Sequence, residues 1–324
     1  MNGFSIIICC YNSESRILST LQALSELEIP SEFQIELILV DNNCTDNTVM
    51  LASEFWIKIN SKFNLIVVTE KNPGLSAARV CGAKIAKYKY LVFCDDDNWI
   101  NKDYLMVAYN LLERRNDIGV LGGQSVAVTD NDIYFPDWFE NEKSSYAVGK
   151  QLQFSGDASF RKYLWGSGMI IRQSIFKMIF DAGLSLLTDR KGSELDSGGD
   201  SEICSRVLLK GFTLYYDERL FFKHYISPSR LTKTYLIRLT EGHQRAYKIL
   251  ECYWNYIDYC SKRFDIRFRV GVINILRLIK FLIINHSVNK LILERILLSY
   301  KLFGLISNTN YKKINQIALD LKSL

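Results

Sequence analysis

Short apolar runs alternate with helical patterns along the first hundred residues. Four runs rich in branched side chains predict β-strands at Phe4–Cys9, Ile35–Val40, Leu65–Thr69 and Tyr90–Cys94. The helices expected between them cover Ile17–Leu27, a segment from a cap at Thr45 or Asp46 to Phe55, and Gly74–Ala86. Continuous apolar strands between helices favour an α/β fold with a parallel sheet that is covered on both faces.

The pattern changes after residue 100. Further strands are expected at Gly119–Val128, Gly168–Ile171 and Thr213–Tyr216, and a helix at Ser201–Leu209. Loops are expected over Tyr134–Ser159 and Lys191–Asp200, and helical periodicity begins at Leu231 and continues to the end. We therefore expect one domain over residues 1–230, built from halves 1–100 and 101–230, and a helical region over 231–324.

Charge separates the same two regions. The 324 residues carry a net charge of +5, but the segment from residue 233 onward has 16 Lys+Arg against 6 Asp+Glu, a net of +10. Such a basic segment favours contact with an anionic surface. A hydrophobic content of 48% with only 4 prolines excludes bulk disorder. The eight cysteines lack zinc-site spacing, no apolar run approaches the roughly 18 residues needed to cross a bilayer, and no secretory signal is evident. We therefore expect a cytoplasmic protein with reduced thiols.

Polar residues follow three of the predicted strands, where parallel α/β sheets bind ligands. They are Tyr11-Asn12, Asp41-Asn42 and Asp95-Asp96-Asp97. Three adjacent carboxylates repel one another unless a cation offsets them, and oxygen ligands suit Mg²⁺ or Mn²⁺. Residues two apart on an extended segment point the same way, so Asp95 and Asp97 are expected to share one cation while Asp96 faces elsewhere. An acidic turn that caps the next helix, near Asp103, is the alternative.

Four further sites have a functional and a structural interpretation. Asp200 opens a helix after a glycine-rich loop, where it would act as a general base or simply stabilise the helix terminus. His224, one of three histidines, would be a metal ligand or a hydrogen-bonded core residue. Trp165 to Gly168 would offer a ring surface to a sugar or pack in a turn. Arg79 would bind a phosphate or pair with an acid.

Six motifs taken together resemble the family 2 glycosyltransferases of the GT-A fold. In chain order they are IIICCYNSE, LILVDNNCTDNT, EKNPGLSAARVCGAKIA, YLVFCDDDN, WGSGMIIR and GGDSEIC. Their order and spacing over residues 4 to about 230 carry the resemblance, because each motif alone is weak. It implies a Rossmann-like, mostly parallel sheet flanked by helices over 1–230, with 231–324 as a basic helical extension.

The resemblance also implies roles for individual residues. Contacts to the nucleotide sugar are implied for Cys10, Tyr11, Asn12, Glu14, Asp41, Asn43, Arg79, Asp95 and Asp96. Contacts to the acceptor are implied for the loop of Trp165, Gly166, Ser167 and Gly168. The metal ligands implied are Asp97, Asp95 and His224, and the cofactor would be Mn²⁺ or Mg²⁺.

Asp200 matches the second acid of the family's Glu-Asp pair, which is the catalytic base, although Gly199 stands in place of the first acid. In the segment KHYISPSRL, similarity to some bacterial members implies that the arginine meets phosphate. The Q-x-x-R-W signature of processive synthases is missing at Gln244-Arg245-Ala246, which favours transfer of one sugar per encounter.

The expected activity is transfer of a sugar, with inversion, from a nucleotide diphosphate donor, with uridine the expected base. The acceptor would be a glycan or a lipid-linked hydroxyl in bacterial cell-surface polysaccharide synthesis. A nucleotidyl- or phosphotransferase would need a phosphate-binding glycine motif or a nucleophilic aspartate, and neither is present. A non-catalytic nucleotide-sugar or glycan-binding module is the other alternative. Nucleic acid is not expected as a partner, because the basic residues of the tail lie among aliphatic ones.

The segment RFRVGVINILRLIKFLII, residues 267–284, has a basic half and an apolar half on a helical wheel. Such a helix lies on an anionic membrane or packs against the enzyme or a second copy, and both interpretations stay open. Attachment at the inner face of the cytoplasmic membrane would bring the enzyme close to a lipid-linked acceptor.

Overall fold

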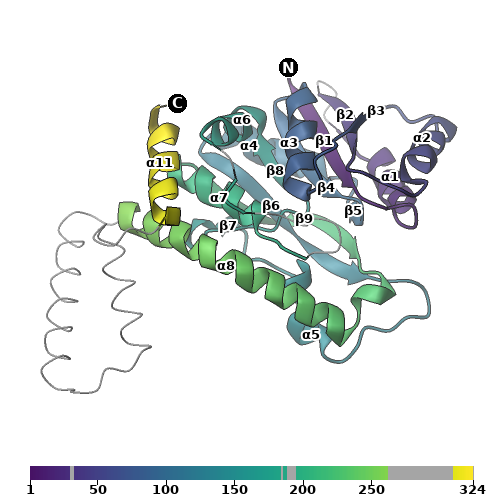
Figure 1. Cartoon of the computed structure of the whole chain (residues 1–324). Helices are drawn as coiled ribbons and strands as arrows, with labels where there is room; N and C mark the ends of the chain where they lie inside the picture. Colours follow the sequence, from purple (N-terminus) through teal and green to yellow (C-terminus); the bar gives the residue numbers. More distant parts are fainter. Residues whose placement is uncertain (30–32, 184, 188–194, 262–308, 324) are drawn as a thin grey trace, which may run out of the picture.

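The computed structural model of the chain describes residues 1–29, 33–183, 185–187, 195–261 and 309–323. Residues 30–32, 184, 188–194, 262–308 and 324 lie outside this description, and with them the amphipathic segment 267–284. In the described part of the chain, nine strands form one sheet between layers of helices (Figure 1). The strands are β1 Gly3–Cys10, β2 Gln34–Asp41, β3 Asn64–Thr69, β4 Tyr90–Asp95, β5 Asn98–Ile100, β6 Ile118–Val128, β7 Gly156–Asp157, β8 Met169–Arg172 and β9 Thr213–Tyr225.

The helices expected around Ile17–Leu27, before Phe55, at Gly74–Ala86 and at Ser201–Leu209 are present, whereas those at Phe139–Glu142 and Gln173–Asp181 were not predicted. The described helices are α1 Ile17–Ser25, α2 Thr48–Lys58, α3 Leu75–Ile85, α4 Tyr104–Arg114, α5 Phe139–Glu142, α6 Gln173–Asp181, α7 Gly199–Leu209, α8 Lys233–Ser261 and α11 Thr309–Ser323. Short 3₁₀ turns lie at Lys143–Tyr146, Ser159–Arg161 and Pro228–Arg230. The N-cap residue of α2 is Asn47 and not the expected Thr45 or Asp46, although the Asp46 carboxylate accepts the Thr48 amide at 3.1 Å. Asp103 is the N-cap residue of α4, but its side chain makes no capping hydrogen bond.

The strand order is β3-β2-β1-β4-β8-β6-β9-β5, with β7 beside β9. Strands β1 to β4 pair in parallel, as predicted. The second half is mixed, because β8 runs antiparallel to both β4 and β6, and β5 and β7 run antiparallel to β9. Strand β9 is longer than the expected Thr213–Tyr216. Its register against β6 shifts at the charged stretch in its middle, but the pairing of the two strands continues beyond that shift. His224 therefore lies within a strand and not after one.

Two apolar cores occupy the two faces of the sheet. Alternate residues of β1 point to opposite faces, so Ile6 and Ile8 pack with α1, α2 and α4, while Ile7 packs with α3, α6 and α7. Helix α3 approaches closely because it is built from small residues: a Cβ on Gly82 would lie 2.5 Å from the Ile7 side chain. The small-residue helix thus fixes the position of Arg79 at the sheet.

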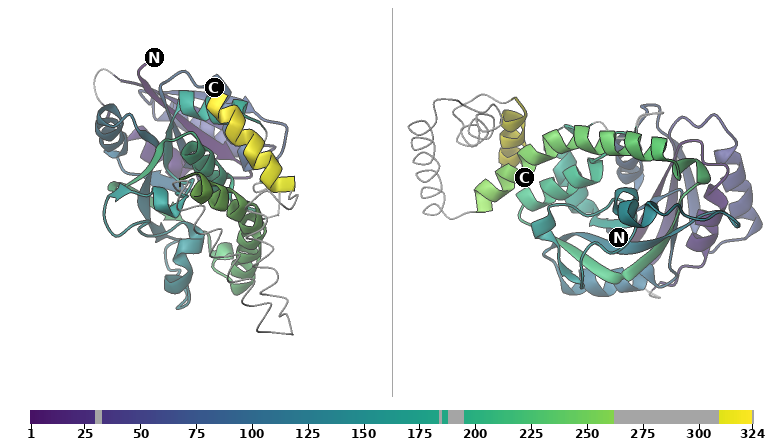
Figure 2. Two further views of the ribbon diagram at one scale, coloured as in Figure 1. Left: turned by 90° about the vertical axis from the view of Figure 1, so that its left-hand side faces the viewer. Right: turned by 90° about the horizontal axis from the view of Figure 1, so that it is seen from below.

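Helices α8 and α11 belong to the same packed body as the sheet domain. Tyr253 of α8 and Ile317 of α11 are buried in the same apolar core as α6 and α7. The Tyr256 hydroxyl donates to Asn315 Oδ1 at 2.8 Å, and the two helices lie side by side (Figure 2). Helicity in the predicted region 231–324 is thus confirmed for its described residues, whereas the division at residue 230 stays a prediction. No described helix combines the length and apolarity that crossing a bilayer requires.

Candidate functional site

The carboxyl ends of β1, β2 and β4 meet at one edge of the sheet. Cys10 is paired with Asp41 in the register of β1 and β2, and Cys9 with Asp95 in that of β1 and β4. A cavity of about 1200 Å³ opens at this edge. It is lined by the acidic triplet, by the Trp165–Ser167 loop, by the start of α7 and by one side of α8. The site thus lies where the strand pattern predicts it.

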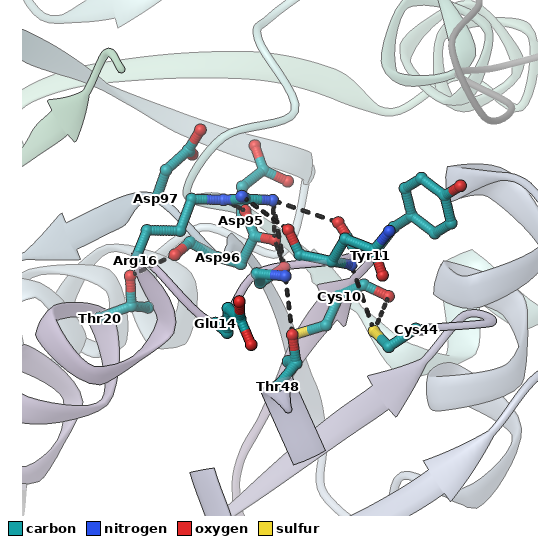
Figure 3. Close-up of polar contacts among 12 residues, drawn as sticks. Cys10, Tyr11, Glu14, Arg16, Thr20, Cys44, Thr48, Asp95, Asp96 and Asp97 are labelled. Atoms are coloured by element: carbon teal, nitrogen blue, oxygen red, sulfur yellow. Dashed lines mark hydrogen bonds and ion pairs between the residues drawn. The ribbon is translucent and has the colours of Figure 1, made fainter. Parts of the chain in front are cut away.

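The three aspartates of the triplet point in two directions. The Asp95 and Asp97 carboxylates lie on the same side of the segment, while Asp96 turns toward Arg16 (Figure 3). Asp96 accepts the Arg16 guanidinium at 2.9 and 2.7 Å and also the Ser13 hydroxyl. Arg16 lies in the turn before α1, and its charge offsets the repulsion between neighbouring carboxylates. The expected orientation of Asp96 is confirmed.

Asp97 lies among largely buried basic side chains. Arg230 donates to its Oδ2 at 2.8 Å, and His224 Nε2 lies 3.4 Å from its Oδ1. Burial raises the pKa of Asp97, but His224, Arg230 and Arg16 together outweigh burial, so the pKa lies below its ordinary value. Asp97 is therefore ionised and faces the cavity with a fixed negative charge.

Asp95 and Asp200 are connected by the backbone of the Trp165–Ser167 loop. The Ser167 hydroxyl donates to Asp95 Oδ2 at 2.7 Å, and the Gly166 amide donates to Asp200 Oδ2 at 2.8 Å. Arg79 Nη2 lies 3.7 Å from Asp95 Oδ1. The loop must approach closely, since a Cβ on Gly166 would lie 2.6 Å from Arg79 Nη2. The three acids 95, 97 and 200 therefore converge on one cavity, as expected.

Asp200 also shows why its helix begins where it does. Gly198, with φ of 105°, is the N-cap residue, and Asp200 lies in the first turn of α7. Its Oδ1 accepts the Ser201 amide at 2.7 Å, so one oxygen serves the helix terminus and the other serves the loop. Asp200 thus stabilises the start of α7 and also lines the cavity. Its catalytic role stays a prediction.

The remaining expected site residues divide into two groups. Those that line the cavity besides the acids are Cys10, Tyr11, Asn43, Arg79, Trp165, Gly166, Ser167 and His224. Those outside its lining are Asn12, Glu14, Asp41 and Gly168. Three of this second group accept backbone amides of the segment before α2: Asp41 accepts the Cys44 amide at 2.9 Å, Glu14 the Asn47 amide at 3.0 Å and Asn12 the Thr45 amide at 2.8 Å.

Asn42, one of the polar residues expected at the ligand-binding edge of the sheet, lines the cavity and is buried. Its side-chain amide accepts from the Gly74 N–H at 2.8 Å and donates to the Asn72 carbonyl at 2.7 Å, so it shapes the loop before α3. Other lining residues have no counterpart among the sequence-based predictions. Arg16 contacts an acid 80 positions away, which no local pattern reveals. From α8 come His243, Tyr247 and further side chains that no motif identifies.

The donor set for a divalent ion can be tested against this geometry. The described residues contain no cluster of three or more His, Cys, Asp or Glu side chains placed to bind a metal. Asp97 and His224 are adjacent and line the cavity, and His224 Nδ1 is buried and has no hydrogen-bond partner within the described part of the chain. Mg²⁺ usually takes one or two carboxylates and completes its shell with substrate phosphates and water, so the Asp97 carboxylate suits this ion, whereas the His224 imidazole is not a ligand that Mg²⁺ prefers.

Comparison with known proteins agrees with this geometry. A family model described as glycosyl transferase family 2 matches residues 5–180. The chain belongs to that family. The match includes β1 to β8, and therefore the acidic triplet and the Trp165–Ser167 loop, but it ends before α7 and α8.

Individual relatives of this glycosyltransferase family are bacterial. The chain is 29% identical over 116 residues to the poly(ribitol-phosphate) beta-N-acetylglucosaminyltransferase TarS of Staphylococcus aureus, which covers 36% of this chain and 20% of that protein. It is 34% identical over 118 residues to the poly(ribitol-phosphate) beta-glucosyltransferase of Bacillus spizizenii, a match that covers 35% of this chain and 18% of that protein. The match thus spans about a fifth of each relative's length.

The fold comparison extends further along the chain. The crystal structure of S. aureus TarS 1-349 in complex with UDP-GlcNAc aligns with a TM-score of 0.57 at 17% identity, covering 99% of this chain and 91% of that one. The same segment in complex with UDP aligns with a TM-score of 0.56. The family 2 chain thus has the GT-A fold, with a helical C-terminal region.

Proposed function

We propose that the protein is an inverting, non-processive glycosyltransferase that moves a sugar from a uridine diphosphate donor to a hydroxyl of a glycan or lipid-linked acceptor. Polysaccharide synthesis at the bacterial cell surface is the proposed context. The observation that carries the proposal is the convergence of Asp95, Asp97 and Asp200 on one cavity, connected through Gly166 and Ser167. Family membership supports the class of reaction, and the UDP-GlcNAc bound to the similarly folded TarS supports the kind of donor.

In the proposed reaction the acceptor oxygen attacks the anomeric carbon on the face opposite the leaving group. A bond from the acceptor oxygen to that carbon forms, the bond to the β-phosphate oxygen breaks, and the electron pair leaves with UDP. Asp200 takes the proton of the acceptor hydroxyl. The Gly166 amide holds one Asp200 oxygen, which orients the carboxylate toward the cavity.

Positive charge is available at the donor end. Arg79 and Arg230 line the cavity and are both largely buried, where their charge is less screened than at the surface. Arg230 donates to Asp97 through Nη1, while its buried Nε has no acceptor among the described residues and would suit a diphosphate oxygen. Asp97 and His224, with Asp95 nearby, would hold Mn²⁺ or Mg²⁺. A bound divalent ion would supply charge neutralisation for the departing diphosphate.

The decisive experiment replaces Asp200 by asparagine. Asp200→Asn should lower UDP release from a UDP-sugar in the presence of acceptor by at least about 10²-fold, the range of general-base contributions. UDP-sugar affinity by isothermal titration should stay within about threefold of wild type, below the tenfold that 1.4 kcal/mol represents. Asp181→Asn, an exposed aspartate at the end of α6, is the matched control.

Two results separate the alternatives. Near wild-type turnover in Asp200→Asn would exclude Asp200 as the base. Binding of UDP-sugars by the wild-type chain without turnover, with Mn²⁺ present and a panel of acceptors offered, would instead support a non-catalytic nucleotide-sugar-binding module.

A further inference from the structure

The cavity has a second wall that the family-matched region does not supply. Helix α8 contributes His243, Tyr247 and Trp254 to the lining, and these residues lie beyond residue 180, where the family match ends. The volume of about 1200 Å³ exceeds the roughly 300–1000 Å³ typical of a site for one small ligand. There is therefore room for a second ligand beside a nucleotide sugar.

Close packing places this wall next to Asp200. A Cβ on Gly198, two residues before Asp200, would lie 3.0 Å from Ala246 Cβ of α8. Further along, Gly242 permits a backbone contact, since a Cβ there would lie 2.0 Å from the Leu195 carbonyl oxygen. The segment before α7 and the helix α8 are thus fitted to each other, and Tyr247 follows directly after Ala246.

The aromatic side chains of this wall form one continuous cluster. The Trp254 ring lies 6.1 Å from the Tyr163 ring at an interplanar angle of 23°, and 5.4 Å from the Tyr247 ring at 80°. Tyr247 is 52% exposed although it borders a cavity. The Trp254 indole N–H is buried and has no hydrogen-bond acceptor within the described part of the chain. An exposed ring beside a donor suits a sugar, which has an apolar C–H face and a rim of hydroxyls.

One cation completes the cluster. The Arg161 guanidinium lies 4.7 Å from the centre of the Tyr163 ring and lines the cavity. No described carboxylate forms an ion pair with it, in contrast to Lys150 on the same lining, which contacts Glu218 at 2.9 Å. A guanidinium held over an aromatic ring remains available to an anion approaching from the cavity.

We propose that Tyr247, Trp254 and Tyr163 form an acceptor subsite for a sugar ring, and that Arg161 receives an anionic group on the same glycan. The subsite rests on the proposed function, because it places the acceptor beside Asp200. It assigns the recognition of an acidic saccharide to α8 together with Tyr163 and Arg161, whereas the acidic triplet and its arginines serve the donor.

The test measures glycan binding in the presence of UDP and Mn²⁺ by microscale thermophoresis. The probes are hyaluronan hexasaccharide, which has rings and charge, cellohexaose, which has rings only, and poly(ribitol phosphate), which has charge only. We expect the wild-type chain to bind hyaluronan about tenfold more tightly than cellohexaose, since one charge-assisted contact is worth roughly 1.5 kcal/mol. Poly(ribitol phosphate) should bind more weakly than hyaluronan.

Variants separate the ring from the charge. Tyr247→Ala should weaken binding of both ring-bearing probes about tenfold, consistent with the size of stacking contacts, whereas Tyr247→Phe should stay within about twofold. Arg161→Gln should reduce the affinity for hyaluronan to that for cellohexaose. Tyr134→Ala removes a tyrosine that is 90% exposed outside the cavity, and it should change nothing.

The failures are distinguishable. UDP affinity, measured in parallel, reports on the donor end, and its absence in the wild-type chain would count against the proposed function. Intact UDP binding with no affinity for either ring-bearing probe would overturn the subsite alone. So would a Tyr247→Ala variant that binds both as the wild type does, or a preference for poly(ribitol phosphate) over hyaluronan.

Discussion

Replacing Gly166 by alanine should separate catalysis from folding. The added methyl would lie 2.6 Å from Arg79 Nη2 and 3.0 Å from Asp200 Cβ. Non-bonded heavy atoms prefer about 3.5–4.0 Å, so one neighbour must move by roughly 1 Å. Arg79 is buried beside Asp95, and the Gly166 amide donates a hydrogen bond to Asp200. Movement of either neighbour therefore displaces a residue of the proposed active site.

The expected fall in the turnover of Gly166→Ala follows from these contacts. A misplacement on the order of 1 Å costs about 10²-fold in rate. Weakening the Gly166 hydrogen bond to the Asp200 carboxylate also removes part of the roughly 1.5–3 kcal/mol that such a bond contributes. We therefore expect the rate of UDP release from a UDP-sugar with acceptor present to fall about 10²-fold, while the free energy of unfolding falls by no more than about 3 kcal/mol.

The assay compares Gly166→Ala with Gly156→Ala, a glycine of β7 at which a Cβ would meet nothing within 4 Å. The control should keep wild-type turnover and stability. UDP release gives the rate, and urea unfolding gives the stability. Wild-type turnover in Gly166→Ala would refute the reasoning, because the loop would then not set the position of Asp200 or Arg79.

Three further outcomes are expected. Arg230→Gln should weaken UDP-sugar affinity about tenfold in calorimetry, as loss of a charge-assisted contact requires, whereas Arg219→Gln on the surface should not. Tyr253→Phe should lower the free energy of unfolding in urea by about 1 kcal/mol, because its hydroxyl donates to buried Glu202 at 2.8 Å. The pKa of Asp97 is depressed in the native state, whereas in the unfolded chain it is about 3.9, so the unfolded chain takes up this proton first as pH falls. The stabilisation that ionised Asp97 provides is therefore present above about pH 3.9 and is lost as pH falls through the native pKa. Asp97→Asn should flatten this acid branch when the free energy of unfolding is plotted against pH.

The N-terminal half was predictable because its signals are local. Strands β1, β2 and β4 are buried on both faces and read as continuous apolar runs, and their polar ends mark the site, whereas β3 at the edge of the sheet is only partly buried. The orientation of Asp95 and Asp97 followed from the alternation of an extended segment. The small-residue stretch Gly74–Ala86 indicated a helix, whereas its close packing on the sheet at Gly82 is seen only in the structure.

The rest depends on contacts between distant positions. Arg16 and Asp96 are 80 residues apart, and Arg230 reaches Asp97 across 133 residues, so neither pair appears in any local pattern. Strand β9 was underestimated because its charged stretch Asp217–Arg219 interrupts the alternation, although pairing with β6 continues beyond it. Helix α8 was expected as a helix, but its periodicity does not reveal that one side lines the cavity.

The position of α8 has an evolutionary consequence. One uninterrupted helix, encoded after the family-matched segment, supplies a wall beside the proposed base without supplying any of the acids. Recombination or drift confined to that stretch of the gene would alter which glycans are accepted while the transfer chemistry is inherited intact. Lineages under pressure to vary their surface sugars would then accumulate change in this helix faster than in the acidic edge of the sheet.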